Sequence, residues 1–177
     1  MLKMIFLGLL LALAAFAAYV AMLPSQFAVE RSAIIAAPPQ AVFAQVNDFH
    51  KWQEWSPWAK LDPNAKAVFE GKDAGEGASF SWDGNSEVGS GKMTITESKP
   101  DERIAMRLEF TAPMTATNTT VFTFKPEGAG TRMTWNMSGE NNFIGRAMCL
   151  FMDMDKMVGS MFEKGMENIN AMVAKKA

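Results

Sequence analysis

Only a few residues of the chain have the chemistry of an active site. The 177-residue sequence contains one histidine, His50, and one cysteine, Cys149. A Cys–His pair can act as a nucleophilic dyad, but Cys149 lies in the apolar run AMCLFM, which is typical of a buried, inert thiol. A single cysteine also excludes a disulfide within the chain and any multi-cysteine metal site. The sequence therefore predicts no thiol nucleophile, no metal site and no cofactor.

Acidic side chains and one glycine-containing motif are the remaining candidates. Glu30, Asp48 and Glu54 could move protons, but nothing in their spacing pairs two of them as acid and base. The motif GSGKMT, residues 89–94, has Met after its Lys and runs into a strand pattern, unlike a phosphate-binding loop. We therefore predict no catalytic residue, and the sequence favours a binding protein over an enzyme.

Charge excludes one class of partner. The formal net charge is −2, and no run of like charges occurs along the chain. Nucleic-acid-binding domains usually carry a basic patch. We therefore expect no nucleic-acid partner.

The first elements to place are at the N-terminus. The run Met4–Leu23 is uncharged and apolar, and as a helix it would be ~30 Å long, the thickness of a hydrocarbon core. This predicts a single-pass transmembrane anchor within residues 1–24. Ala15–Ala17 resembles a cleavage site, so a cleaved signal sequence is the alternative. With Lys3 on the cytoplasmic side, the soluble domain would be periplasmic or otherwise extracytoplasmic, on the inner membrane.

The middle of the chain alternates apolar and polar residues, which is typical of strands with one buried face. In RIAMRLEF, residues 103–110, every second side chain is large and apolar. The same pattern occurs in SFSW, KMTITES, VFTF and TRMTWNM, and turn residues separate these runs. Residues 27–37 read as a further strand, and the prolines that follow suit the start of a short helix. We expect an antiparallel sheet with one solvated face.

A sheet of this kind needs a cover on its apolar face. The segment from Ile144 to about Val173 is predicted to form one long helix that provides it. Its polar side chains recur every three or four residues and form one stripe: Asp153, Lys156, Ser160, Glu163, Glu167 and Asn170. Gly159 and Gly165 interrupt the helix and predict a bend or close packing there.

This order of elements resembles the START-like (SRPBCC) superfamily of helix-grip proteins, which includes polyketide cyclase/dehydrase-like and Bet v 1-type proteins. The residues that carry the resemblance are Ile34, Ala36, Pro38, Val42, Phe43, Asp48, Phe49, Trp52, Trp55 and Trp58. Further residues resemble a membrane-anchored bacterial branch: Asp62, Pro63, Gly71, Gly75, Gly77, Trp82, Gly84 and Asn85. The resemblance implies an α+β helix-grip domain over residues 27–174, with a curved antiparallel sheet, two short helices and a long C-terminal helix.

In this superfamily an apolar cavity lies between the sheet and the terminal helix. The resemblance implies that it is lined here by Trp52, Trp55, Phe80, Trp82, Met93, Ile95, Met106, Leu108, Phe110, Phe122, Phe124, Met133, Trp135, Phe151, Met154, Val158 and Phe162. Methionine adapts to varied apolar shapes, which suits such a lining. Simple filling of an irregular core is the alternative for each Met.

The three tryptophans at 52, 55 and 58 fall on one side of a helical turn, until Pro57 ends it. They could wedge the short helices against the sheet, form the rim of the cavity, or lie at a membrane interface.

The resemblance implies a membrane-tethered protein that binds a hydrophobic small molecule or lipid. Two alternatives stay open, namely a cyclase/dehydrase-type enzyme acting on an apolar substrate and an adaptor that binds a protein partner. Inward polar side chains such as Arg31 or Asn118 could orient the polar end of a ligand.

Overall fold

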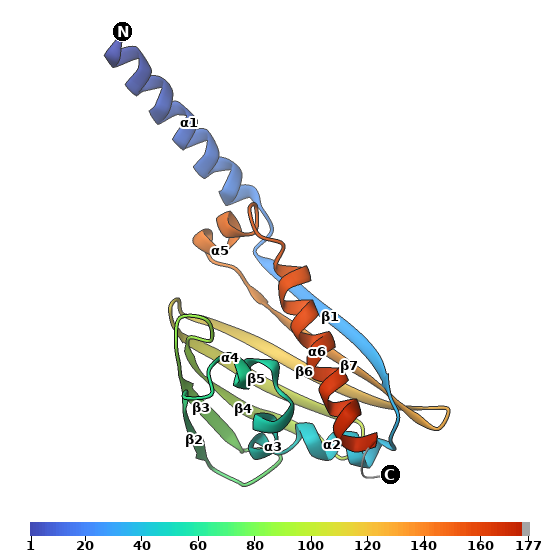
Figure 1. Ribbon diagram of the computed structural model, residues 1–177. Coiled ribbons are helices and arrows are strands. Elements are labelled where there is room, and N and C mark those ends of the chain that lie inside the picture. The colour runs from blue at the N-terminus through green and yellow to red at the C-terminus, as the bar shows by residue number, and fades with distance from the viewer. Residues whose placement is uncertain (175–177) are drawn as a thin grey trace.

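The computed structural model describes residues 1–174, and Figure 1 labels its helices and strands. In chain order they are α1 (Leu2–Met22), β1 (Gln26–Ile35), α2 (Pro39–Val46), α3 (Phe49–Trp55), α4 (Pro57–Leu61), β2 (Lys66–Glu70), β3 (Ser79–Asp83), β4 (Ser90–Lys99), β5 (Arg103–Ala112), β6 (Ala116–Glu127), β7 (Gly130–Glu140), α5 (Phe143–Met148) and α6 (Met154–Ala174). A curved sheet grips α6, whereas α1 projects away from the domain (Figure 1).

The sheet is fully antiparallel, with the strand order β1-β7-β6-β5-β4-β3-β2. Strand β1 pairs with β7, so that the first and last strands of the domain are neighbours. The alternation seen in the sequence puts Ile104, Met106 and Leu108 of β5 in the buried layer. Two register shifts interrupt the pairing of β4 with β5. Such irregularities bend a strand and increase its twist, which helps the sheet to curl around α6.

Helix α6 lies against the concave face, and its packing explains one of its glycines. Phe162, Met166 and Ile169 are almost fully buried against the sheet. A Cβ at Gly165 would lie 2.9 Å from Cζ3 of Trp135. The interior glycine therefore permits a close approach of the helix to the sheet, which is one of the two roles expected for it.

The prediction of one continuous C-terminal helix from Ile144 is wrong. The structure has the short helix α5, a break, and then α6 from Met154. Asp153 starts the new helix, because its side chain accepts a hydrogen bond from the backbone N–H of Lys156 (3.0 Å). This is an N-cap, which places the residue before the helix and not within its polar stripe.

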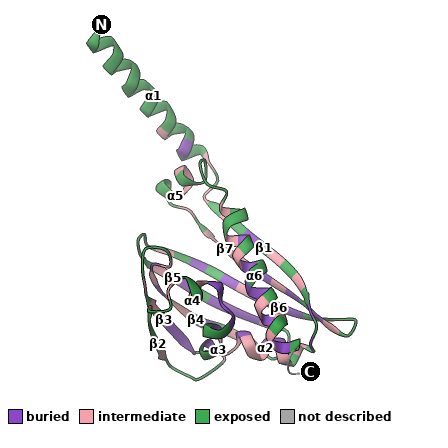
Figure 2. Ribbon diagram, viewed as in Figure 1, coloured by how far each residue is buried: buried purple, intermediate pink, exposed green. Residues whose placement is uncertain are grey.

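Helix α1 stands apart from the domain. Nearly all of its side chains are exposed, and Val20 near its C-terminal end is the buried exception (Figure 2). Within residues 1–174 it is the one helix long and apolar enough to span a membrane, with a mean hydropathy of 2.5.

The predicted α+β helix-grip fold is confirmed. Besides the break in the C-terminal helix, two details differ from the expectation. Strand β2 was not predicted, because the run KAVFE is short and lacks a clear alternation. Three short helices instead of two lie between β1 and β2, since Pro57 ends α3 and also occupies the first turn of α4, where the missing N–H of proline is tolerated.

Candidate ligand-binding cavity

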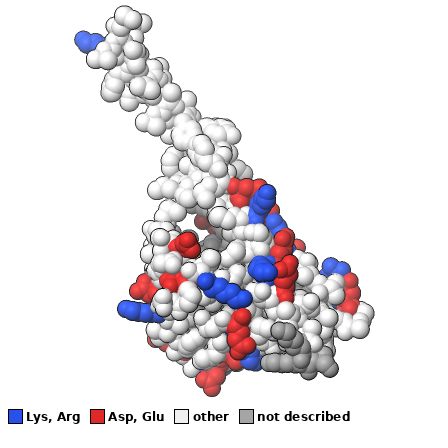
Figure 3. Space-filling view, viewed as in Figure 1, with Lys and Arg blue, Asp and Glu red and all other residues white. Residues whose placement is uncertain are grey.

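A cavity of about 260 Å³ lies between the short helices, the sheet and the start of α6. Its lining is mostly apolar and rich in aromatic side chains. It consists of Trp52, Gln53, Ser56, Trp58, Ala59, Asp62, Pro63, Ala65, Ala67, Phe80, Trp82, Glu87, Val88, Met93, Leu108, Phe110, Thr120, Trp135, Met137, Val158 and Phe162. The surface is hollowed below α5 in the space-filling view (Figure 3).

The short helices hold the three tryptophans in different surroundings. Trp52 and Trp55 are buried, and their indole N–H groups donate to the carbonyls of Val46 (2.9 Å) and Gln45 (3.1 Å). These carbonyls lie at the end of α2, where they have no partner within the helix. The two tryptophans therefore fasten α3 to α2 in the core. Trp52 and the partly buried Trp58 also line the cavity.

Trp135 of β7 is the centre of the aromatic wall. Its ring stacks on Phe162 of α6 with a centroid distance of 4.2 Å and an interplanar angle of 9°. The rings of Trp52 and Trp58 meet it edge-on at 6.2 Å and 5.9 Å. Close aromatic pairs add to the energy of burial. This wall is therefore a closely packed part of the lining, formed by side chains from four elements, α3, α4, β7 and α6.

A second aromatic group forms the opposite side of the cavity. The indole N–H of Trp82 donates to the carbonyl of Val88 (3.1 Å), and its ring stacks near Phe80 at 5.9 Å. A Cβ at Gly91 would lie 2.6 Å from this indole. The glycine on the neighbouring strand β4 therefore makes room for the ring.

One polar atom in the lining lacks a partner. The side chain of Trp135 is 3% exposed, and its Nε1 is buried without a hydrogen bond within residues 1–174. The indole N–H groups of Trp52, Trp55 and Trp82 are all satisfied by backbone carbonyls. An unpaired buried donor costs ~1–3 kcal/mol. Protein atoms enclose this N–H group, so an acceptor on a bound molecule reaches it only after the surrounding side chains move.

The charged groups of the lining are all acidic. Asp62 and Glu87 contribute carboxylates, and the lining within the described chain has no Lys, Arg or His. Asp62 Oδ2 accepts a hydrogen bond from the backbone N–H of Asn85 (2.7 Å), which joins α4 to the loop after β3. The negative charge of these carboxylates therefore disfavours an anionic ligand in the cavity.

The structure brings together about half of the predicted lining. Trp52, Phe80, Trp82, Met93, Leu108, Phe110, Trp135, Val158 and Phe162 surround the cavity. Trp55, Ile95, Met106, Phe122, Phe124 and Met133 lie in the buried core instead. Phe151 and Met154 lie outside both, since Phe151 is 79% exposed in the break before α6 and Met154 is half-buried at its first turn.

Sequence reasoning missed the residues that come from turns and helix ends, such as Asp62, Glu87 and Val88. It also missed the inward members of strands and helices that are small or polar, such as Ala59 and Thr120. Thr120 and Met137 each lie two positions from an inward residue, Phe122 and Trp135 respectively, and so point to the same face of the sheet. Parity was therefore a usable signal for these two.

The two candidates for nucleophilic chemistry lie far apart. His50 is on α3 and Cys149 follows α5, at opposite ends of the domain (Figure 1). The His50 ring stacks on Phe69 and its Nδ1 is 3.0 Å from Asp48 Oδ1 at the surface. Cys149 is exposed, so the prediction of a buried thiol is wrong. No group of three or more His, Cys, Asp or Glu side chains within residues 1–174 could hold a metal ion.

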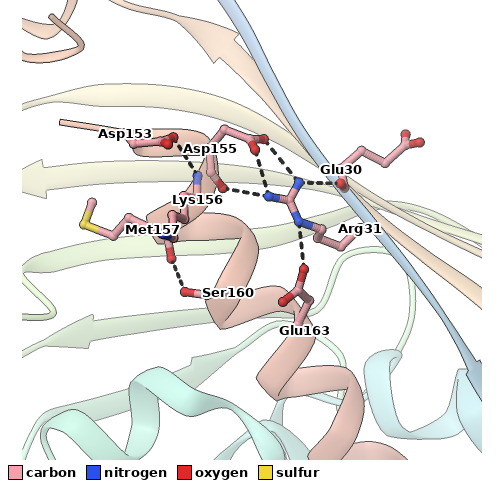
Figure 4. A network of polar contacts seen from close by, with 8 residues as sticks. All are labelled: Glu30, Arg31, Asp153, Asp155, Lys156, Met157, Ser160 and Glu163. Atoms are coloured by element: carbon pink, nitrogen blue, oxygen red, sulfur yellow. Dashed lines mark hydrogen bonds and ion pairs between the residues drawn. The ribbon is translucent and has the colours of Figure 1, made fainter.

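Arg31 faces inward as expected, but its guanidinium is hydrogen-bonded to residues of α6. Its guanidinium donates to Asp155 (2.8 Å from Nη2 to Oδ2) and to Glu163 (3.0 Å from Nε to Oε1), as Figure 4 shows. The hydrogen bond from Arg31 lowers the pKa of Asp155 and raises that of Arg31. A Cβ at Gly159 would lie 2.2 Å from the guanidinium. Arg31 is thus a clamp on the start of α6 and not a ligand-orienting residue.

A grip of seven antiparallel strands around a long helix, with an apolar cavity between them, defines the class of helix-grip proteins. The sequence profile of the family "Polyketide cyclase / dehydrase and lipid transport" matches residues 26–174, and the chain belongs to this family.

Solved structures agree with this fold. Protein MLL2253 from Mesorhizobium loti aligns with a TM-score of 0.63 and 15% identity, over 85% of this chain and 99% of that one. The protein Ara h 8.0201 aligns with a TM-score of 0.59 and 9% identity, over 85% and 99%. The subunit of the Aha1 dimer from Colwellia psychrerythraea aligns with a TM-score of 0.58 and 12% identity, over 81% and 93%. At these identities the likeness concerns the fold alone. No curated protein matches the chain.

Proposed function

We propose that this protein is tethered to a membrane and holds a hydrophobic small molecule or lipid in its cavity. The lining carries the proposal, because it combines two aromatic groups with a few polar side chains, such as Gln53, Ser56 and Thr120. Small-molecule sites have this composition, mostly apolar with a few polar groups that fix orientation. The family, whose description includes lipid transport, supports the same conclusion.

The size and charge of the cavity narrow the ligand class. At about 260 Å³, the volume is just below the range of ~300–1,000 Å³ typical of ligand pockets. It suits a small ligand or one end of an acyl chain better than a whole phospholipid. The carboxylates of Asp62 and Glu87 favour a neutral or cationic ligand.

The tether is proposed from α1. Its 21 residues give a length of ~30 Å, enough to cross a hydrocarbon core. Lys3 in the first turn of α1 supports an inner-membrane anchor with the domain on the extracytoplasmic side. The resemblance of Asp62, Pro63, Gly71, Gly75, Gly77, Trp82, Gly84 and Asn85 to the membrane-anchored branch supports the same arrangement. The intact mass of the mature chain distinguishes this anchor from a cleaved signal sequence.

Native mass spectrometry of the full chain, released from detergent micelles, tests the cavity. We expect a reproducible extra mass that is lost on denaturation. The variant Val158→Trp fills the cavity at α6 and should lose this mass, whereas Ser160→Trp, at an exposed position of the same helix, should keep it. If no mass is found, and no neutral or cationic member of a lipid panel binds, the carrier proposal is wrong.

The same experiment separates the alternatives. A ligand that is chemically altered during incubation would support a cyclase/dehydrase-type enzyme. Capture of a protein partner that is equally strong for Val158→Trp and the unmodified chain would support an adaptor.

A further inference from the structure

The stretch between β7 and α6 exposes most of its apolar side chains. The exposed fractions are Phe143 43%, Ile144 57%, Met148 37%, Leu150 37%, Phe151 79% and Met152 41%. We call these side chains the α5 patch. Figure 2 shows this stretch beside the end of α1, with little of it buried. Contiguous exposed apolar surface of this kind marks a site of contact with a partner or a membrane.

The α5 patch is fastened to the C-terminal end of α1. Arg146 Nη1 donates to the carbonyls of Ala21 (3.0 Å) and Leu23 (3.2 Å). These groups end the helix, where carbonyls lack intrahelical partners and a positive charge is favourable. The backbone N–H of Asn141 also donates to the carbonyl of Ser25 (2.7 Å). The position of α1 therefore fixes the position of the patch.

We propose that the α5 patch lies in the headgroup region of the bilayer that α1 crosses. This inference rests on the proposed tether. A helix as long as the hydrocarbon core is thick has its last turn at the interface, and Arg146 holds α5 at that level. Apolar faces of short amphipathic segments bury there, and aromatic side chains such as Phe151 are favoured.

Continuity with α1 selects lipid as the occupant. The exposed apolar side chains of α1 are followed by those of the patch. Arg146 is the charged residue between them, and its Nη1 donates hydrogen bonds to the carbonyls of α1. Charged side chains lie on the domain beside and below it (Figure 3). A protein partner or a second copy covering only the patch would have to fit between the domain and the membrane surface.

The proposal gives the cavity an orientation. Val158 lines the cavity from the first turns of α6, a few residues after the patch ends. With the patch in lipid, this part of the lining is held near the bilayer surface. An apolar ligand could then pass between bilayer and cavity over a short path, with little exposure to water.

The native Cys149, which is exposed within the stretch, serves as the probe. The full chain is labelled there with an environment-sensitive fluorophore and reconstituted into phosphatidylcholine/phosphatidylglycerol vesicles. The control carries the label at position 68 in a C149S/V68C variant, since Val68 is 52% exposed on the distant strand β2. We expect a blue-shifted emission at Cys149 that lipids brominated near the headgroup quench, and no quenching at position 68. A Phe151→Asp substitution should remove most of the blue shift without changing the fold.

The outcomes distinguish this proposal from the tether on which it rests. If the chain does not float with the vesicles, the tether fails and the inference with it. If the chain floats but both labels are equally exposed to water, the tether stands and the α5 patch is not in lipid. A shielded Cys149 label that lipids do not quench, together with disulfide-linked dimers of the unlabelled chain through Cys149, would identify a second copy as the occupant and overturn the proposal.

Discussion

The stretches 143–153 and 154–174 are neighbours, and both are rich in Met and contain Phe, yet they lie in opposite environments. Phe162 is 2% exposed in the core, whereas Phe151 is 79% exposed beside α1. The second stretch repeats its polar residues every three or four positions and so has one face to bury. The first has no such period. An apolar composition shows that a segment avoids water, but its periodicity decides whether a sheet can cover it.

The largest test of this contrast exchanges one phenylalanine for alanine in each stretch. Phe162→Ala should lower the free energy of unfolding by ~3–5 kcal/mol, because it opens a cavity beneath Trp135. Phe151→Ala should change it by no more than ~0.5 kcal/mol, as at other exposed positions. Urea unfolding of the full chain in detergent, followed by tryptophan fluorescence, measures both. Equal losses would show that the first stretch also belongs to the core.

Gly165 sharpens the description of the buried stretch. Replacing a glycine in a helix interior with alanine normally stabilises the helix by ~1 kcal/mol. At this site the new Cβ meets the Trp135 ring at 2.9 Å, and overpacking costs ~1–3 kcal/mol. We therefore expect Gly165→Ala to destabilise the domain. The control Ala171→Gly, at an exposed position of α6, should show the ordinary loss of helix propensity. A stabilised Gly165→Ala protein would contradict the close packing.

Arg146 tests the connection of the exposed stretch to α1. Replacing it with methionine removes the hydrogen bonds to Ala21 and Leu23 but keeps an unbranched side chain. Amide hydrogen exchange in residues 143–153 should become faster, while exchange in α6 stays the same, because the two helices are separate units. Arg132→Met, at an exposed position near the start of β7, is the control. Faster exchange throughout α6 would mean that α5 supports the core.

The smallest effect is expected at the clamp on α6, and it depends on pH. The hydrogen bond from Arg31 depresses the pKa of Asp155 below its ordinary 3.8. A depressed carboxylate pKa contributes stability above the unfolded value and loses it as the pH falls through the folded value. Asp155→Asn should therefore slightly lower the melting temperature at pH 7 and make no difference well below pH 3.8. A difference that persists in acid would exclude this ion pair as its cause.

Much of the fold followed from pattern alone. The alternation in residues 103–110 and the period of α6 are strong signals, because each has a clear buried face. Strand β2 escaped prediction because five residues with little alternation give no such signal. The break before α6 escaped it because Asp153 fits both a polar stripe and an N-cap, and only the hydrogen bond to Lys156 distinguishes them.

The candidate site was less accessible to prediction than the fold. Inward parity identified Trp82, Met93 and Trp135, but it could not separate cavity from core, and Phe122 and Met133 share that parity. The distinction depends on how strongly the sheet curls away from α6. Rim residues such as Glu87 come from turns, which carry no period.

The joint between α1 and β1 has a mechanical consequence. Three residues, 23–25, separate the two elements, and an extended chain of that length reaches only ~10 Å. The backbone hydrogen bond from Asn141 N–H to the Ser25 carbonyl restrains this short connection further. If α1 is embedded, the domain therefore cannot swing toward a distant acceptor, as a carrier on a long linker could. The cavity therefore stays within one domain's width of the membrane surface, and a recipient of the ligand must approach the domain there.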